Sequence, residues 1–213
     1  MRKIITTVIL ILSISFAFAQ DDAKAKKLLD DVSNKISKYE NIYVQFKYNL
    51  DNTKEKVHQE TRGDVTMKGD LYNVNFLGTN QFFDGKKTYT IITEDEEVNI
   101  SDAEDNEEGT ITPSKFFTFY KNGFNYKWDI LQNMSGRKIQ YVKLIPIDSN
   151  SDIKQILLGV DINTNHIYKL IETGNNGTVT TLTVSEFKTN QAISKTLFTF
   201  DKSKYENYII NDL

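Results

Sequence analysis

Short segments in which apolar and polar residues alternate make up most of this chain, and this pattern limits the fold more than any other feature. Residues 42–50 place Ile, Val, Phe, Tyr and Leu at every second position, and residues 57–68 alternate in a similar way. A period of two is typical of a β-strand with one buried face. Turn pairs such as Gly69-Asp70 and Asp84-Gly85 separate the segments, which favours antiparallel hairpins.

About ten or eleven strands at hairpin spacing are expected from this pattern, before a final edge strand. The further segments are residues 72–76, 81–83, 88–93, 98–100, 124–130, 138–147, 153–161, 166–172 and 178–188, with a final edge strand at Leu197, Phe198 and Phe200. An antiparallel sheet of this size tends to curl into a barrel or half-barrel. An amphipathic helix is expected to begin at Asp22, because apolar residues recur at helical spacing at Ala25, Leu28, Leu29, Val32 and Ile36.

One apolar segment, residues 112–128, interrupts the alternation near the middle of the chain. Thr112 is a suitable N-cap, Pro113 suits the first helical position, and Gly123 suits the left-handed residue that ends a helix. We expect a helix of roughly 10 residues at most, which forms a lid. Its aromatic side chains are Phe116, Phe117, Phe119 and Tyr120.

The first residues are typical of a secretory signal peptide. Arg2 and Lys3 precede an apolar run, and Ala17-Phe18-Ala19 is a small-residue cleavage site, so cleavage is expected after Ala19. Residues 1–19 are then the signal peptide and 20–213 a single domain, because two prolines and ten glycines leave no linker-like stretch. The chain has no cysteine and a net charge of −3, which argues against disulfides, lipid attachment to a thiol and nucleic-acid binding.

No recognised catalytic arrangement is present in the sequence. His58 and His166 are far apart and lie in no nucleophile or metal-binding motif, and no glycine-rich phosphate loop follows a strand. The acidic residues at 94–97 and 102–108 lack the glycine of a calcium loop, since Glu107 occupies that position. We therefore expect a solvated acidic loop, no enzyme activity, no cofactor and no metal.

The order of several short motifs resembles that of the periplasmic outer-membrane lipoprotein carrier family, LolA. These motifs are Tyr43-Val44-Gln45-Phe46, Gly63-Asp64-Val65-Thr66-Met67-Lys68, Phe82-Phe83-Asp84-Gly85-Lys86-Lys87, Thr112-Pro113 and Phe198-Thr199-Phe200-Asp201. The resemblance implies an unclosed antiparallel β-barrel, mainly β with α+β character, whose apolar cavity is covered by the first helix and a short helical lid.

The same resemblance implies a function and its partners. The protein is expected to be a monomeric periplasmic carrier, without catalysis, that shelters the acyl chains of lipoproteins. It would receive them from an inner-membrane lipoprotein-releasing transporter and pass them to an outer-membrane acceptor. This agrees with the physics of exposed acyl chains, which need an apolar shelter to cross water.

The alternation and the resemblance together predict the binding site. The expected cavity residues are Val44, Phe46, Met67, Val74, Phe76 and Ile91, closed by the lid residues Phe116, Phe117, Phe119 and Tyr120. Family members often place an arginine that ties the lid to the barrel just after the lysine matching Lys68, where this chain has Gly69. Lys68 or Arg62 is the expected substitute latch.

Three alternatives remain open from the sequence. The first is a periplasmic binding protein for a free lipid, a glycolipid or another hydrophobic molecule, or an envelope sensor of similar architecture. The second is a hydrolase whose carboxylates follow no recognisable pattern. The third is a barrel packed solid by its own aromatic side chains, with the predicted lid as ordinary core.

Overall fold

The computed structural model describes residues 21–102 and 113–213, which divide into two compact units. The helix unit combines residues 21–37 with 120–179, and the lid unit combines residues 38–102, 113–119 and 180–213. The chain passes between the two units at residues 37–38, 119–120 and 179–180, so each unit is assembled from segments distant in sequence. Within the described ranges, no helix is both long and apolar enough to cross a membrane.

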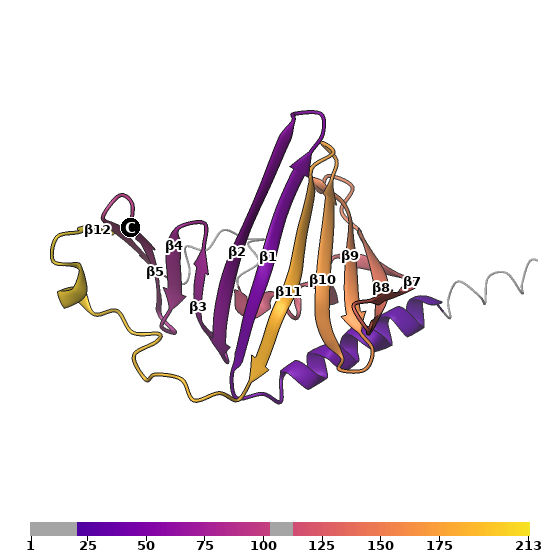
Figure 1. The fold of residues 1–213 in the computed structure, drawn as a ribbon, viewed down its shortest axis with the longest axis horizontal. Coiled ribbons are helices and arrows are strands. Elements are labelled where there is room, and N and C mark those ends of the chain that lie inside the picture. The colour runs from indigo at the N-terminus through magenta and orange to yellow at the C-terminus, as the bar shows by residue number, and fades with distance from the viewer. Residues whose placement is uncertain (1–20, 103–112) are drawn as a thin grey trace, which may run out of the picture. The chain divides into compact units, whose positions relative to one another are not determined.

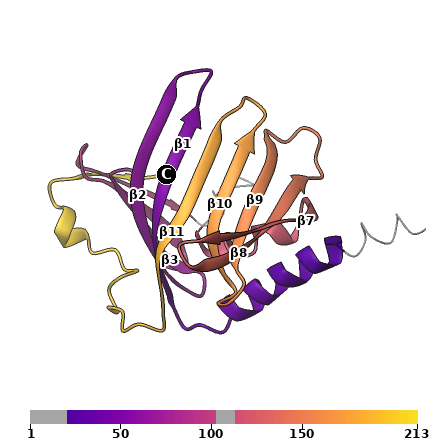
Figure 2. The ribbon, with the colours of Figure 1, turned by 45° about the vertical axis from the view of Figure 1, so that its right-hand side comes forward.

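The helix unit contains the expected N-terminal helix, at residues 21–36, whose side chains Ala25, Leu29 and Val32 are buried. Its strands are β7 (Phe124–Met134), β8 (Arg137–Pro146), β9 (Ile153–Asp161) and β10 (His166–Gly174), paired in that order and antiparallel. Figure 2 shows these strands in their sheet. β8 and β9 hold the core: Ile156 and Leu158 lie on one face of β9, whereas β8 buries apolar side chains on both of its faces, at Ile139 and Leu144.

The lid unit contains the other eight described strands. They are β1 (Ile42–Asn52), β2 (Val57–Lys68), β3 (Leu71–Phe76), β4 (Thr79–Phe83), β5 (Lys87–Ile92), β6 (Glu97–Asp102), β11 (Val179–Thr189, all but its first residue) and β12 (Ile209–Asp212). Their order is β12-β6-β5-β4-β3-β2-β1-β11 (Figure 1). The fold class is confirmed as mainly β, with an N-terminal helix and a large, unclosed, predominantly antiparallel sheet.

Two details of the predicted elements are wrong. Residues 197–200 form no strand, and the described chain has a twelfth strand instead, β12, which pairs in parallel with β6. The expected single helix after Pro113 is two 3₁₀ turns, η2 (Pro113–Lys115) and η3 (Phe119–Lys121). Backbone bonds over three residues, such as Thr118 N to Lys115 O at 2.9 Å, replace the α-helical ladder. Gly123 does adopt the expected left-handed conformation, with φ 84°, whereas Thr112 and the acidic loop 103–108 lie outside the described residues.

The C-terminal segment covers one face of β4, β5 and β6. Buried side chains on that face form a cluster of Phe82, Ile91, Val98 and Ile100, against which Tyr89, Phe200, Tyr205, Tyr208 and Ile210 pack. Tyr89 stacks between Phe82 and Phe200, with ring centroids 4.9 and 4.8 Å away, and the Phe200 ring stacks on Tyr205 at 5.5 Å. Side-chain stacking therefore holds Phe200, where a strand was expected.

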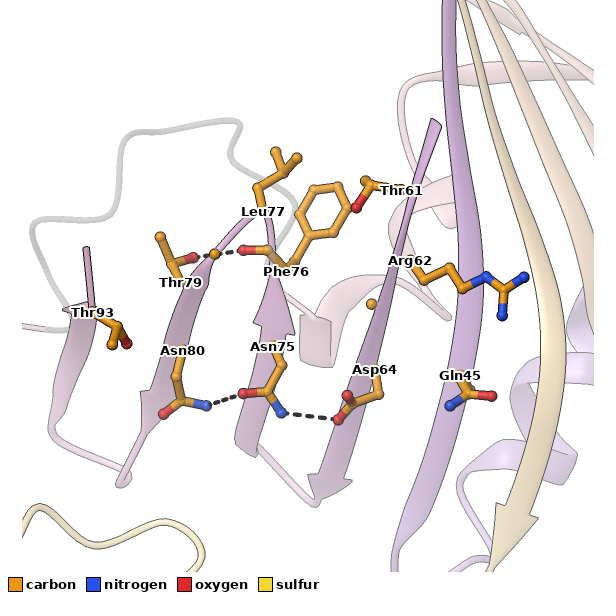
Figure 3. A pocket seen from close by; sticks show the side chains of 12 residues that line it. Gln45, Thr61, Arg62, Asp64, Asn75, Phe76, Leu77, Thr79, Asn80 and Thr93 are labelled. Carbon is orange, nitrogen blue, oxygen red and sulfur yellow. Dashed lines mark hydrogen bonds between the residues drawn. The ribbon is translucent and has the colours of Figure 1, made fainter. Parts of the chain in front are cut away.

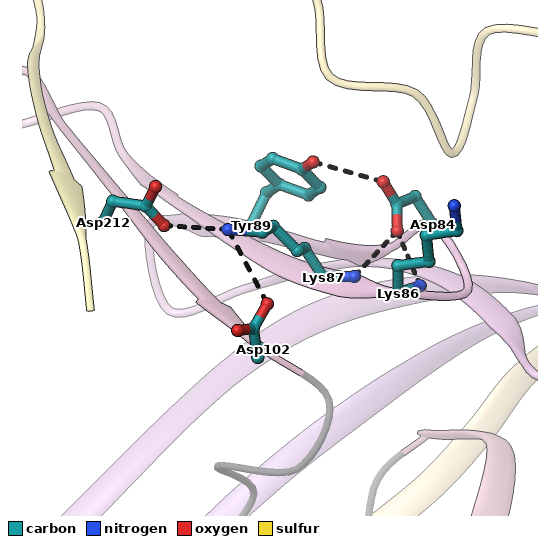
Figure 4. A network of polar contacts seen from close by, with 6 residues as sticks. All are labelled: Asp84, Lys86, Lys87, Tyr89, Asp102 and Asp212. Atoms are coloured by element: carbon teal, nitrogen blue, oxygen red, sulfur yellow. Dashed lines mark hydrogen bonds and ion pairs between the residues drawn. The ribbon is translucent and has the colours of Figure 1, made fainter.

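A polar network fastens the same segment at its end (Figure 4). The Lys87 ammonium donates to Asp212 at 2.9 Å and forms an ion pair with Asp102 at 3.6 Å. The Asp84 carboxylate accepts the backbone N–H of Lys87 at 2.8 Å and the Tyr89 hydroxyl at 3.2 Å. The Asp84 hairpin and the chain end are thus tied to the same strand, β5.

Gly63 is a position where a side chain has no room. Gly63 is opposite Phe46 in the β1–β2 register, and a Cβ there would lie 2.5 Å from Phe46 Cζ and 2.8 Å from the Asn75 carbonyl oxygen. The Phe46 ring therefore lies across the bare backbone of β2, an arrangement that only glycine permits.

We predict that Gly63→Ala lowers the free energy of unfolding by about 1–3 kcal/mol, because overpacking forces Phe46 or β3 to shift. Chemical denaturation measures this loss. In a Phe46→Leu background the same substitution should cost less, since the ring atom nearest the new Cβ is gone. Equal costs in the two backgrounds would contradict the proposed contact.

A second prediction concerns Glu172 on β10. Burial raises the pKa of Glu172, and its carboxylate has no ion-pair partner among the described residues. A raised folded-state pKa means that ionisation opposes folding above the unfolded pKa of about 4.3. Glu172→Gln should therefore stabilise the protein at pH 7 and have little effect near pH 3.5, where the carboxyl is neutral in both states. Urea unfolding at both pH values tests this, and a gain of equal size at the two would disprove it.

Candidate functional site

The lid unit holds an apolar cavity of about 250 Å³ on one face of its sheet. Its wall consists of Val44, Phe46 and Tyr48 from β1, Val65 and Met67 from β2, Val74 and Phe76 from β3, and Leu182 and Val184 from β11. Pro113, Phe116 and Phe117 complete it. This face of the sheet therefore has an apolar cavity, and none of the described residues in its wall is charged.

The register of the strands explains why these side chains meet. Val44 is opposite Val65, and Val65 is opposite Val74, so that one row of valines crosses three strands on the same face. The Phe76 ring closes the next part of the wall, with its centroid 5.5 Å from that of Phe46 and 5.1 Å from that of Tyr48. Aromatic pairs at these separations add to the stabilisation from burial.

The segment 113–119, here called the lid, covers the cavity with its first aromatic residues. Its first turn, η2, lies against β2 and β3. Phe117 is 5% exposed and its ring contacts Phe187 of β11 at 6.4 Å, while Phe116 lies perpendicular to Phe117 at 5.3 Å. The described contacts of the lid side chains with the sheet are apolar.

Five of the six predicted cavity residues line this cavity, and the sixth does not. Ile91 lies in the cluster under the C-terminal segment, on the opposite face of the sheet. The register gives the reason: Val74 is opposite Gln81 and Gln81 is opposite Thr90, so the cavity face of β5 carries Thr90 and its neighbour Ile91 points the other way. The placement of Ile91 in the cavity was wrong.

The four predicted lid aromatics have three different positions. Phe116 and Phe117 line the cavity, and Phe119 contacts the Phe116 ring at 6.2 Å without lining it. Tyr120 is 1% exposed in the helix unit, where its hydroxyl donates to the Leu29 carbonyl at 3.0 Å. Burial strongly raises the pKa of Tyr120, which keeps the hydroxyl a donor. Tyr120 is therefore an anchor of the chain beyond the lid and not part of its cover.

Neither predicted latch residue reaches the lid. Arg62 lines a separate polar hollow beside Asp64 and Asn75, and Lys68 is exposed at the end of β2. In the described part of the chain neither side chain forms an ion pair. Ring contacts such as that of Phe117 with Phe187 hold the lid instead.

Sequence reasoning missed five residues of the cavity: Tyr48, Val65, Pro113, Leu182 and Val184. Tyr48 and Val65 have the same alternation parity as the chosen residues of their strands, so the signal was present. Leu182 and Val184 come from β11, which lies beside β1 although 126 residues separate the end of β1 from its start. Alternation along a strand does not indicate such a distant neighbour.

Both histidines have pKa values that are shifted by their surroundings. Asp51 accepts from His58 at 2.6 Å and raises its pKa, but both side chains are exposed on the surface. Burial lowers the pKa of His166 in the helix unit. Among the residues described, no group of three or more His, Cys, Asp and Glu is placed to hold a metal ion.

Comparisons with known proteins identify the family. The family model described as outer membrane lipoprotein carrier protein LolA matches residues 15–172. No curated protein matches the sequence. The fold is similar to that of an uncharacterized conserved protein from Thermus thermophilus, at 13% identity over 89% of this chain and 99% of that chain, with a TM-score of 0.57. It is also similar to LprF from Mycobacterium bovis, at 14% identity over 81% of this chain and 95% of that chain, with a TM-score of 0.50. Because the family model covers well over half of its length, this chain belongs to the LolA family of outer membrane lipoprotein carrier proteins.

Proposed function

We propose that this protein is a periplasmic carrier that shelters the acyl chains of lipoproteins in the cavity of the lid unit. The observation that carries the proposal is an apolar cavity, lined by three strands that neighbour one another and by β11, with a separate lid of aromatic residues. Membership of the LolA family supports it. The proposed route begins with export and cleavage after Ala19. The protein then acts as a monomer between an inner-membrane releasing transporter and an outer-membrane acceptor.

The energetics of the cavity fit an acyl ligand. Each buried methylene contributes about 0.8 kcal/mol, so an acyl chain gains much of its binding energy from an apolar wall alone. The wall offers branched, aromatic and thioether side chains, and Met67 adapts readily to an irregular chain. With no charge among the described wall residues, such a site binds a hydrocarbon by its length and width, whatever protein is attached to it.

The size of the cavity implies that the lid moves. Ligand pockets usually measure roughly 300–1,000 Å³, and this one measures about 250 Å³ with the lid closed. Another apolar group displaces the apolar contacts of the lid more easily than it would displace a buried ion pair. We therefore propose that Phe116 and Phe117 swing away from the sheet when acyl chains enter.

Replacing Phe116 with Gln tests the function directly. A polar amide over the cavity loses apolar contact with the chain, so we expect palmitate and an N-palmitoylated peptide to bind about tenfold more weakly. Isothermal titration calorimetry measures the affinity for both ligands, and circular dichroism checks that the sheet stays folded. The matched control is Ile147→Gln, since Ile147 is an exposed apolar residue in the helix unit.

The outcomes separate the alternatives. Unchanged binding in Phe116→Gln would contradict the lid, and no binding of either ligand to the unaltered protein would contradict the carrier function. Native mass spectrometry of protein purified from the periplasm identifies the natural ligand. An acylated peptide supports lipoprotein transport, whereas a free lipid or glycolipid favours a different hydrophobic-ligand carrier or a sensor.

A further inference from the structure

A second hollow, of about 390 Å³ and mainly polar, adjoins the apolar cavity in the lid unit (Figure 3). Phe76 lines both, so that one ring separates them. The polar hollow is lined by Gln45, Thr61, Arg62, Gly63, Asp64, Asn75, Phe76, Leu77, Gly78, Thr79, Asn80 and Thr93. Its paired residues Gln45, Asp64, Asn75 and Asn80 lie on the face of the sheet opposite the valine row of the cavity, so the two hollows meet at Phe76, where β3 ends.

The hollow exists because β2 is longer than its neighbour β3. β2 pairs with β1 over Val57–Met67 but with β3 only over Asp64–Lys68. Residues 57–63 of β2 thus have no strand on their second side in the described part of the chain, and Figure 1 shows β1 and β2 extending beyond β3. Every second residue of such an edge directs its N–H and C=O outward, and an extended chain pairs readily with such groups.

The side chains around this edge suit a peptide. Figure 3 shows a row of amides in which Asn80 donates to the Asn75 side chain at 2.8 Å and Asn75 donates to Asp64 at 3.0 Å. Arg62 lies on the same strand, with its side chain directed over β1 in Figure 3, and its guanidinium has no ion-pair partner in the described ranges. Amides donate and accept equally well, as peptide groups do, and the arginine cation favours a partner with an acidic residue or chain end.

Leu77 adds an apolar contact at the rim. It is the first residue of the two-residue turn between β3 and β4, with φ 52° followed by φ 78° at Gly78. Asn or Gly is the relaxed choice at that position, and a leucine there is strained. The side chain is nevertheless 51% exposed, so the fold gains little from it. A strained, exposed leucine beside a hollow is placed to contact a ligand.

We propose that the free edge of β2, residues 57–63, binds the peptide that directly follows the acylated residue of the cargo, as an added antiparallel or parallel strand. The inference rests on the proposed carrier function, because it requires the acyl chain to occupy the adjacent cavity. Seven edge residues at about 3.3 Å each give an extended segment enough length to pair. A lipid headgroup has no repeating N–H and C=O groups with which to use this edge, so the occupant is a peptide.

Cysteine cross-linking tests the strand directly, and the chain has no cysteine of its own. Thr61→Cys and Arg62→Cys place thiols on opposite faces of β2, because successive residues of a strand alternate. The probe is a set of N-palmitoylated peptides with one cysteine at successive positions from two to seven. We expect disulfide yields that alternate with a period of two, with the favoured positions exchanged between the two variants. Gln132→Cys, exposed on β7, is the control.

A turn substitution provides a second test without loss of fold. Leu77→Asn relieves the strained conformation, so stability should rise, while the palmitoylated peptide should bind about tenfold more weakly and palmitate unchanged. The matched control is Ser135→Asn, because Ser135 and Gly136 form the corresponding turn between β7 and β8, with φ 49° and 80°. In that variant neither affinity should change.

The results distinguish this inference from the function on which it rests. Palmitate binding with cross-links that show no alternation, or that do not exceed the Gln132→Cys control, overturns the added strand and leaves the carrier intact. Unchanged peptide affinity in Leu77→Asn also counts against the hollow as the peptide site. If palmitate itself does not bind, the result contradicts the proposed carrier function.

Discussion

The packing of the Phe46 ring over the bare backbone of Gly63 is the contact on which the architecture of the lid unit depends. It brings the far end of a large ring against β2, and the Phe76 ring completes the wall with its centroid 5.5 Å from that of Phe46. On one side of these rings lies the apolar cavity, and on the other lies the polar hollow, to which Gly63 also contributes. The boundary between hydrocarbon-like and water-like surroundings is thus set by a glycine and two aromatic residues.

On the opposite face of the same sheet, the apolar surface is covered by the protein's own C-terminal segment. There the C-terminal segment supplies Phe200 and Tyr205 to cover Phe82 and Ile91, and Lys87 fixes its end. That face is filled by the chain itself, in stacked rings. Over the cavity face, the described part of the lid unit places the short lid, and this difference between the faces leaves one of them suited to binding a ligand.

The sequence was most informative about features that depend on a single strand. The bounds of the segments 57–68 and 153–161 agree with β2 and β9, and the parity of alternation placed Val44, Phe46 and Met67 together. It was least informative where several strands must be combined. The face of Ile91 depends on two hairpin registers in series, and an error of one residue reverses it.

Contacts between segments distant in sequence were equally difficult to predict from the sequence. The parallel pairing of β12 with β6 brings the chain end to a strand more than a hundred residues earlier, and its four residues carry no distinct pattern. The anchoring of Tyr120 depends on the Leu29 carbonyl, a backbone group that no side-chain pattern reveals. A run of aromatic residues predicts burial, but which residues bury each ring depends on the tertiary structure.

Among the described residues the lid segment forms no ion pair with the sheet, which bears on the proposed uptake and release of an acyl chain. In the closed state Phe116 and Phe117 occupy the position over the wall that an acyl chain would take. Exchanging one apolar group for another at the same wall leaves little net change in buried area, so the free energies of the empty and loaded states stay close. A charged latch would add a desolvation and pairing term to one state alone. A carrier must both accept and surrender its ligand, and a lid that competes with the ligand for the same surface meets both needs with one set of contacts.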